Sequence, residues 1–118
     1  MANDFKRICT PSIGTSLTTI YAVPAGPSSA ALESIVIGIT MANKTTSGVT
    51  AGIWIDNDDG SNDGWIVKDA TIPAGASLEV MAGNKLVLMN DGSNADNLEA
   101  IASVGTAVDV TVSVLEDV

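Results

Sequence analysis

The feature that most constrains the fold is a short corner that occurs twice in the sequence, each time with Leu-Glu a few residues later. The first copy is residues 23–26 (Val-Pro-Ala-Gly), before Leu32-Glu33, and the second is residues 72–75 (Ile-Pro-Ala-Gly), before Leu78-Glu79. Proline cannot donate to a strand ladder, so the preceding strand ends there, and the glycine can take the positive φ that a sharp reversal needs. The repeat predicts two strand-corner-strand units and two similar layers.

Alternating hydrophobic residues predict strands through most of the chain. Valine occupies every second position from Val108 to Val114, and we expect these valines to face a core. In the second long strand the same alternation predicts inward positions for Ile35, Ile37, Ile39 and Met41, and in the penultimate strand for Leu98, Ala100, Ala102 and Val104. The predicted strands are residues 17–23, 31–42, 49–56, 65–71, 78–81, 85–89, 97–104 and 108–115, with 78–81 and 85–89 paired around a turn at Gly83-Asn84.

The spacing of these strands predicts the fold class. No stretch has a helical period, and short strands separated by turn signals every ~8–12 residues are typical of sandwiches and small barrels. We therefore expect an all-β, single-domain antiparallel β-sandwich that is jelly-roll-like, with an immunoglobulin-like sandwich as the alternative. Residues 1–16 have turn signals and little periodicity, so we expect an N-terminal arm (1–16) followed by the sandwich domain (17–118).

Composition argues against most chemistry. The chain has 118 residues, a net charge of −9 and no histidine. The acidic balance disfavours nucleic acid and anionic membranes as partners, and no apolar run reaches the roughly 18 residues of a membrane helix. Without histidine there is no catalytic triad and no usual zinc site, and the single Cys9 is expected to pack as a small apolar group. We expect no enzyme activity and no cofactor.

An acidic loop at residues 56–64 is one place where a ligand could bind. A two-residue hairpin turn at Asp59-Gly60 would place the carboxylates of Asp56 and Asp63 opposite each other, which is unfavourable unless the loop opens or a cation lies between them. The plainer interpretation is a solvated turn. The alternative is a calcium site formed by Asp56, Asp58 and Asp63, although the spacing does not match an EF-hand.

The same hairpin register places Trp54 opposite Trp65, on the face away from the core. Two adjacent tryptophans there fit a subunit interface or a cross-strand pair packed under a local loop. They also fit a sugar-stacking site, but no polar cluster of Asn, Gln and Arg accompanies the pair.

The predicted outward positions of the strands indicate self-association. They are small and uncharged, whereas strands that face solvent in a monomer usually carry lysine and glutamate. We expect a homo-oligomer, most simply a trimer, with a monomer as the alternative. In the N-terminal arm, Phe5, Lys6 and Arg7 offer an apolar and a basic anchor for a neighbouring protein.

Several stretches of the sequence, taken together, carry a resemblance to a known class of proteins. They are residues 19–26 (Thr-Ile-Tyr-Ala-Val-Pro-Ala-Gly), residues 65–69 leading to the corner at 71–75, residues 85–88 (Lys-Leu-Val-Leu) and the final Val-Asp-Val-Thr-Val-Ser-Val-Leu-Glu. With these stretches, nearly the whole chain resembles small virion structural proteins of tailed bacteriophages, including marine and cyanobacterial phages. The resemblance implies an all-β oligomer without catalytic residues, used in head decoration or in a tail or fibre.

The expected function is that of a head decoration or cement protein. It would be made in the host cytoplasm, oligomerise on the outer capsid surface and stabilise the shell by contacts with the major capsid protein or other virion proteins. A tail or tail-fibre module is the alternative. A carbohydrate- or calcium-binding module that uses Trp54, Trp65, Asp56 and Asp63 is a second alternative.

Overall fold

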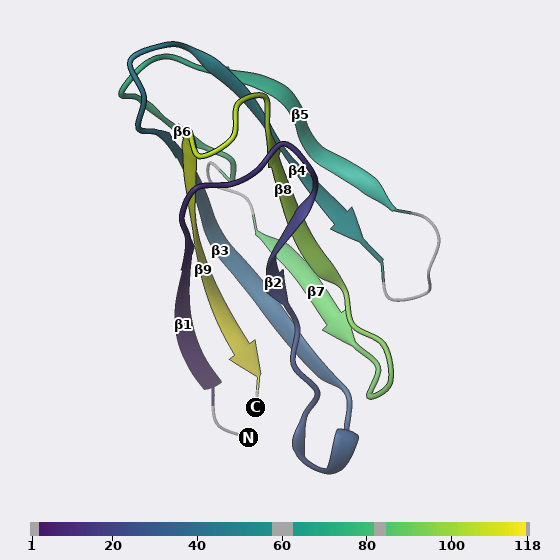
Figure 1. The fold of residues 1–118 in the computed structure, drawn as a ribbon. Helices are drawn as coiled ribbons and strands as arrows, with labels where there is room; N and C mark the ends of the chain where they lie inside the picture. Colours follow the sequence, from purple (N-terminus) through teal and green to yellow (C-terminus); the bar gives the residue numbers. More distant parts are fainter. Residues whose placement is uncertain (1–2, 58–62, 82–84, 118) are drawn as a thin grey trace.

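Nine strands form two antiparallel sheets that face each other in the computed structural model, which describes residues 3–57, 63–81 and 85–117 (Figure 1). The one helical segment in these ranges is the 3-10 turn η1 (Pro27–Ser29), and no helix there is long and apolar enough to cross a membrane. The strands are β1 (Asn3–Thr10), β2 (Thr18–Ala22), β3 (Leu32–Asn43), β4 (Val49–Asp56), β5 (Gly64–Ile72), β6 (Ser77–Glu79), β7 (Leu86–Asn90), β8 (Asn97–Ala102) and β9 (Val108–Asp117). The predicted all-β sandwich is confirmed.

The strand order is that of a jelly roll. Sheet A has the order β1-β9-β3, and both β6 and β7 pair with β3; sheet B has the order β2-β8-β4-β5. Strands β6 and β7 pair with opposite ends of β3, so they act as one interrupted edge strand and each sheet has four strands. Successive strands change sheet except at the β4–β5 hairpin, which stays within sheet B. The prediction that residues 78–81 pair with 85–89 was therefore wrong. The immunoglobulin-like alternative is also excluded, because β1 and β2 lie in different sheets.

The two Pro-Ala-Gly corners have the same role in this topology. Each carries the chain from sheet B to sheet A, the first between β2 and β3 and the second between β5 and β6, at opposite ends of the molecule (Figure 1). Their backbones differ. Gly75 takes the predicted positive φ of 70°, whereas Gly26 has a φ of −74° and Ser28 and Ser29 take the left-handed conformation instead.

The core lies between the sheets and is aliphatic. The four alternating valines of β9, Val108 to Val114, are fully buried as predicted. In β3 the prediction holds for Ile39 and Met41 but was wrong for Ile35 and Ile37. A bulge between Val36 and Gly38 shifts the register, so before it Leu32, Ser34 and Val36 face inward.

Residues outside the central core also have defined places in the sandwich. Residues 3–10, in the expected N-terminal arm, form β1, which pairs with β9 along its whole length. Ile13 is buried, and its N–H donates a 2.8 Å hydrogen bond to the carbonyl of Val108. Val104, predicted to face the core, lies beyond the end of β8 and is half exposed. Cys9 is exposed rather than packed, because it alternates with the inward positions of β1.

Candidate interaction surfaces

The outer face of sheet A carries an apolar row that crosses four strands. Phe5 of β1 pairs with Leu115 of β9, Leu115 pairs with Ile35 of β3, and Ile35 pairs with Val87 of β7. Phe5 is 73% exposed and Val87 is 57% exposed, while the two central residues are partly buried. Met89, the next outward residue of β7, is 51% exposed. A continuous apolar row of this kind, with its outer members exposed, is typical of a surface that contacts another protein.

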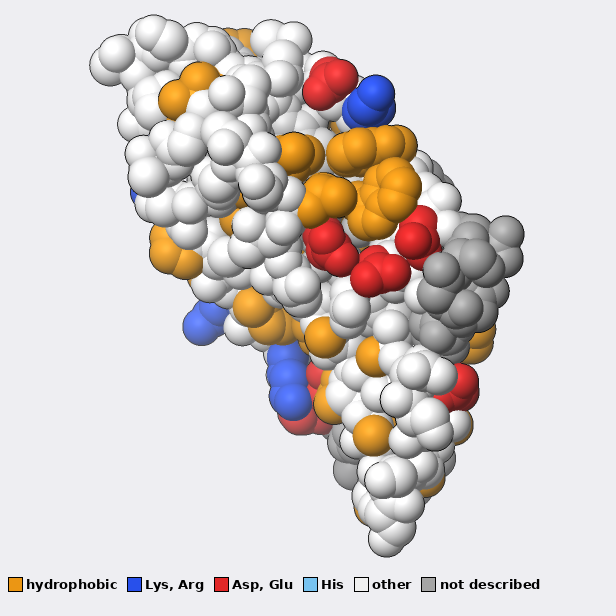
Figure 2. Space-filling model, turned by 45° about the vertical axis from the view of Figure 1, so that its right-hand side comes forward, with side chains coloured by type: hydrophobic (Ala, Val, Ile, Leu, Met, Phe, Trp, Pro, Cys, Tyr) orange, Lys and Arg blue, Asp and Glu red, His pale blue; other side chains and the backbone are white. Residues whose placement is uncertain are grey.

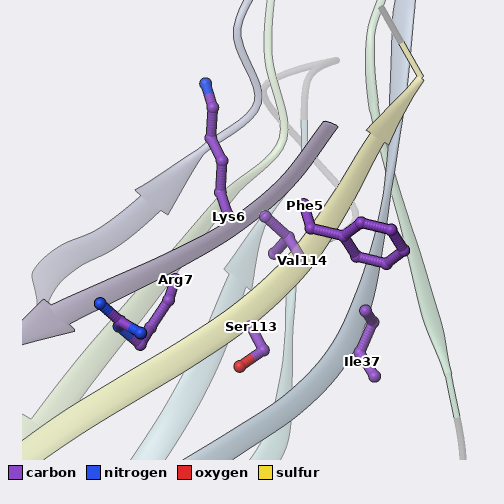
Figure 3. A pocket seen from close by; sticks show the side chains of 6 residues that line it. All are labelled: Phe5, Lys6, Arg7, Ile37, Ser113 and Val114. Carbon is purple, nitrogen blue, oxygen red and sulfur yellow. The ribbon is translucent and has the colours of Figure 1, made fainter. Parts of the chain in front are cut away.

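The bulge in β3 adds Ile37 to this apolar row. Ile37 is exposed and, with Phe5 and Arg7, surrounds a hollow of about 450 Å³ above the small side chain of Ser113 (Figure 3). In the close view, the Phe5 ring extends toward Ile37, and Arg7 lies on the other side of Ser113. Within the described residues the structure assigns Arg7 no ion pair or hydrogen bond. An unpaired guanidinium beside an apolar hollow is available to a partner.

Lys6 also belongs to the lining of the hollow, but its side chain extends to the opposite side of β1 from Phe5 and Arg7 (Figure 3). Its Nζ is 2.9 Å from Oε1 of Glu116, a carboxylate that is 1% exposed. The predicted anchor of Phe5, Lys6 and Arg7 is therefore divided between two faces. Phe5 and Arg7 are available outside, whereas Lys6 holds the edge strand to the sandwich.

Glu116 is the centre of a buried polar cluster between the sheets. The phenol of Tyr21, on β2, donates a 2.6 Å hydrogen bond to Oε2 of Glu116, and the Tyr21 and Ser34 hydroxyls are 2.7 Å apart. Burial, and then the hydrogen bond to Glu116, raises the pKa of Tyr21 well above its usual value of 10.0. The hydrogen bond and charge of Glu116 likewise raise the pKa of Lys6. These groups stabilise the open edge between β1 and β2.

The two tryptophans lie on the outer face of sheet B, as predicted. Trp54 pairs with Trp65 across β4 and β5, with ring centroids 5.0 Å apart and an interplanar angle of 76°. The predicted register is thus confirmed, although the turn itself lies outside the described residues. Trp65 is 39% exposed, and the Nζ of Lys68 is 5.8 Å from its ring centroid. The pair is an edge-to-face contact with one ring partly open to solvent.

Carboxylates gather beside this pair. Glu99 of β8 is the cross-strand neighbour of Trp54, and its pKa is raised first by burial and then by Asp56 and Asp63. In Figure 2, which brings the β4–β5 side of the molecule forward, hydrophobic side chains lie next to acidic ones. Asp58 is outside the described residues, within which no group of three or more His, Cys, Asp or Glu side chains is arranged to hold a metal ion. The calcium interpretation stays a prediction.

Sequence reasoning missed several of these residues. The buried cluster of Tyr21, Ser34 and Glu116 joins three strands that are distant in the sequence, and no local pattern indicates it. One signal for the apolar row was present. Leu115 is an apolar residue in the otherwise polar phase of β9, so its side chain had to lie on the outer face.

Comparisons with known proteins give similar structures but no family. No protein-family model and no curated protein sequence matches the chain. A structure of VP2 in an infectious bursal disease virus subviral particle is 15% identical, with a TM-score of 0.49, and covers 97% of this chain, which spans 32% of that one. A chain from the acid-stable capsid of Helicobacter pylori bacteriophage KHP30 is 11% identical, with a TM-score of 0.48 and coverages of 98% and 87%. A Bacillus endospore appendage pilus chain has a TM-score of 0.39 at 15% identity, with coverages of 97% and 85%. Likenesses with TM-scores below 0.5 assign the chain neither a family nor a function.

Proposed function

We propose that this protein is a non-enzymatic structural component of a virion, a head decoration protein that binds the outer capsid surface. The observation that carries this proposal is the exposed apolar row from Phe5 to Val87 on sheet A. The row is a surface for contacts with protein, and its extension across four strands of one sheet suits attachment to a broad surface. Nearly the whole sequence resembles small phage virion proteins, and this resemblance is the reason for proposing a capsid as the surface to which the row attaches.

The partners of the row are neighbouring copies, most simply in a trimer, and the major capsid protein. Burying the exposed parts of Phe5, Ile37, Val87 and Met89 contributes about 1–2 kcal/mol per side chain. That gain supports a weak single contact, and repeated attachment of an oligomer to a shell raises the overall affinity. The unpaired Arg7 gives this otherwise acidic chain a cationic group beside the row, which suits an acidic or hydrogen-bonding group on the partner.

The test is binding of the purified protein to shells of the virus that encodes it, prepared without this protein. Wild-type protein is expected to sediment with the shells and to raise their resistance to heat. Val87→Glu, which places a charge in the apolar row, is expected to weaken binding at least tenfold. Thr71→Glu adds the same charge at an exposed position of sheet B and serves as the matched control. Binding to isolated tails but not to shells would replace this proposal with the tail or fibre alternative, and binding to neither would reject a virion role.

A second measurement reports on the same face. The Cys9 thiol is exposed on the outer side of β1, where it pairs with Thr111. If sheet A attaches to the shell, bound protein reacts with a thiol reagent more slowly than free protein does. An unchanged rate on the shell would mean that another face makes the contact.

A further inference from the structure

A second hollow, of about 330 Å³, lies on the outer face of sheet B, away from the apolar row. It lies between the Trp65 side of β5 and the connection from β1 to β2, with Ile101 as an apolar part of its lining. The other lining side chains that matter are Thr15, Thr50, Trp65, Lys68, Asp69 and Ser103. The hollow therefore combines one aromatic ring with hydroxyl groups and with one charged group of each sign.

The ring of Trp65 is fixed in place by its neighbours. A side chain at Gly52 would bring a Cβ to within 3.0 Å of Trp65 Cζ3 and 2.9 Å of the Val67 carbonyl, so the ring lies close against bare backbone. Trp54 packs edge-to-face against it. An aromatic platform that is held before the ligand arrives loses little conformational entropy on binding.

The polar groups around Trp65 are free to bind a ligand. Within the described residues, the side chains of Thr15, Thr50 and Asp69 have no hydrogen-bond partner, and Lys68 has no ion pair or hydrogen bond beside its cation–π contact with the Trp65 ring. The hydroxyl of Ser103 accepts a 2.9 Å hydrogen bond from the N–H of Thr50, which leaves its own proton to donate. Donors and acceptors thus surround an apolar platform, an arrangement that matches a sugar, whose hydroxyls do both and whose ring C–H groups are apolar.

Nearby charge decides which kind of sugar fits. Asp56 follows Trp54 by two residues, Asp63 precedes Trp65 by two, and Glu99 lies opposite Trp54. Burial together with the two aspartates raises the pKa of Glu99. This concentration of negative charge disfavours sialylated, sulfated or phosphorylated ligands. We propose that the hollow beside Trp65 binds a neutral hexopyranose unit of a glycan, stacked on the indole ring and hydrogen-bonded by Lys68, Asp69 and the surrounding hydroxyls. The proposal does not depend on the virion role.

The test uses the whole 118-residue chain on an array of neutral oligosaccharides ending in glucose, galactose or mannose, with sialylated oligosaccharides as the acidic arm. The neutral ligand retained most strongly is then titrated while tryptophan fluorescence is recorded. Trp65→Ala is expected to lower affinity at least tenfold. Because that change also removes packing against Gly52, Lys68→Met provides a milder variant, expected to lower affinity about fivefold without changing the melting temperature. Lys85→Met, the same substitution at an exposed position just before β7, is the matched control and keeps wild-type affinity.

Three outcomes would overturn the proposal: no neutral glycan retained at millimolar concentration, a preference for sialylated glycans, or equal affinity in wild type, Trp65→Ala and Lys68→Met. Retention of neutral glycans that is weakened by both variants and kept by Lys85→Met supports it.

Discussion

The phenol of Tyr21 donates a 2.6 Å hydrogen bond to the buried carboxylate of Glu116, and this contact joins β2 of sheet B to β9 of sheet A. Lys6 of β1 completes the arrangement with an ion pair to the same carboxylate. The edge of the sandwich is thus closed by polar contacts at a place where a small aliphatic core would otherwise end. Removing either partner leaves a buried charge with fewer contacts, which destabilises a protein more than the contact itself stabilises it.

This cluster predicts a stability loss at alkaline pH. The folded-state pKa values of Tyr21 and Lys6 are both raised above their ordinary values of 10.0 and 10.5. Their contribution is therefore fully present below about pH 10 and is lost as pH rises through the folded-state values. Tyr21→Phe should cost about 2 kcal/mol at neutral pH and flatten the decline above pH 10. Urea unfolding of wild type and Tyr21→Phe between pH 7 and pH 11 measures the cost at neutral pH and the alkaline decline. If the free energy of unfolding declines equally with pH in the two proteins, the cluster does not cause the alkaline decline.

Lys6→Met tests the ion pair separately. Because the Lys6 side chain is about half exposed, water screens the pair, and we expect a loss of only about 1 kcal/mol. Combining Lys6→Met with Glu116→Gln should cost less than the sum of the single changes, since no unpaired charge remains. Thermal unfolding of the three variants measures the coupling; additive losses would mean that Lys6 and Glu116 do not interact.

Neutralising Glu99 should stabilise the protein, in contrast to the changes at Tyr21 and Lys6. Its folded-state pKa is raised above 4.5 by burial and by Asp56 and Asp63, so ionising Glu99 destabilises the fold, and wild-type stability falls as pH rises through the window above 4.5. Glu99→Gln should stabilise the protein by about 0.5 kcal/mol at pH 7, within the range for like charges on neighbouring strands. The advantage should disappear below about pH 4, where the wild-type carboxyl is protonated. Melting temperatures at pH 7 and pH 4 provide the measurement, and a gain that persists at pH 4 would contradict the charge explanation.

The bulge in β3 predicts different costs for two isoleucines that are two residues apart. Ile39 is fully buried, so Ile39→Ala should cost about 3 kcal/mol through lost burial and cavity formation. Ile37 is 43% exposed on the outer face, so Ile37→Ala should cost less than about 1 kcal/mol. Chemical denaturation of both variants decides the matter: similar large costs would mean that the strand has no bulge and that Ile37 faces the core.

The close packing around Gly52 predicts that this position on the outer face of sheet B does not tolerate a larger side chain. A Cβ there would meet the Val67 carbonyl at 2.9 Å, so Gly52→Ala should cost about 1–3 kcal/mol as the backbone or Trp65 moves. Gly105→Ala is the control, because nothing lies within 4 Å of the Cβ at that position. A shift in tryptophan fluorescence should accompany the first change and not the second. If Gly52→Ala is as stable as the control, the ring of Trp65 does not lie against the backbone.

The sequence was sufficient to predict the buried face of those strands whose two faces differ clearly in polarity. In β9, valine alternates with Asp109, Thr111 and Ser113, and the buried face follows directly. The Trp54–Trp65 register was also predictable, because a short hairpin turn fixes which residues lie opposite each other. Alternation within a strand and register across a short turn depend only on residues close in the sequence, so a local sequence pattern can predict them.

The remaining features depend on contacts between distant strands. Residues 35–39 read Ile-Val-Ile-Gly-Ile, which is apolar in both phases, so periodicity cannot locate the bulge that exposes Ile37. Ser34 is buried because its partners Tyr21 and Glu116 come from other strands. Glu99 meets Trp54 only because β8 pairs with β4. The apolar row likewise can be recognised only when the pairing of its four strands is known. This is why Phe5 was predicted as an anchor but Ile35 and Val87 were not.

The central claim is that the outer face of sheet A is a contact surface between protein molecules, and the mass of the purified protein in solution tests it most directly. Sedimentation equilibrium or light scattering at micromolar to hundred-micromolar concentration should give an oligomer, most simply three times the 12.0 kDa of one chain. Val87→Glu should shift the protein to single chains while Thr71→Glu does not. A wild-type mass of 12.0 kDa across that range, or oligomers that Val87→Glu leaves intact, would contradict the account.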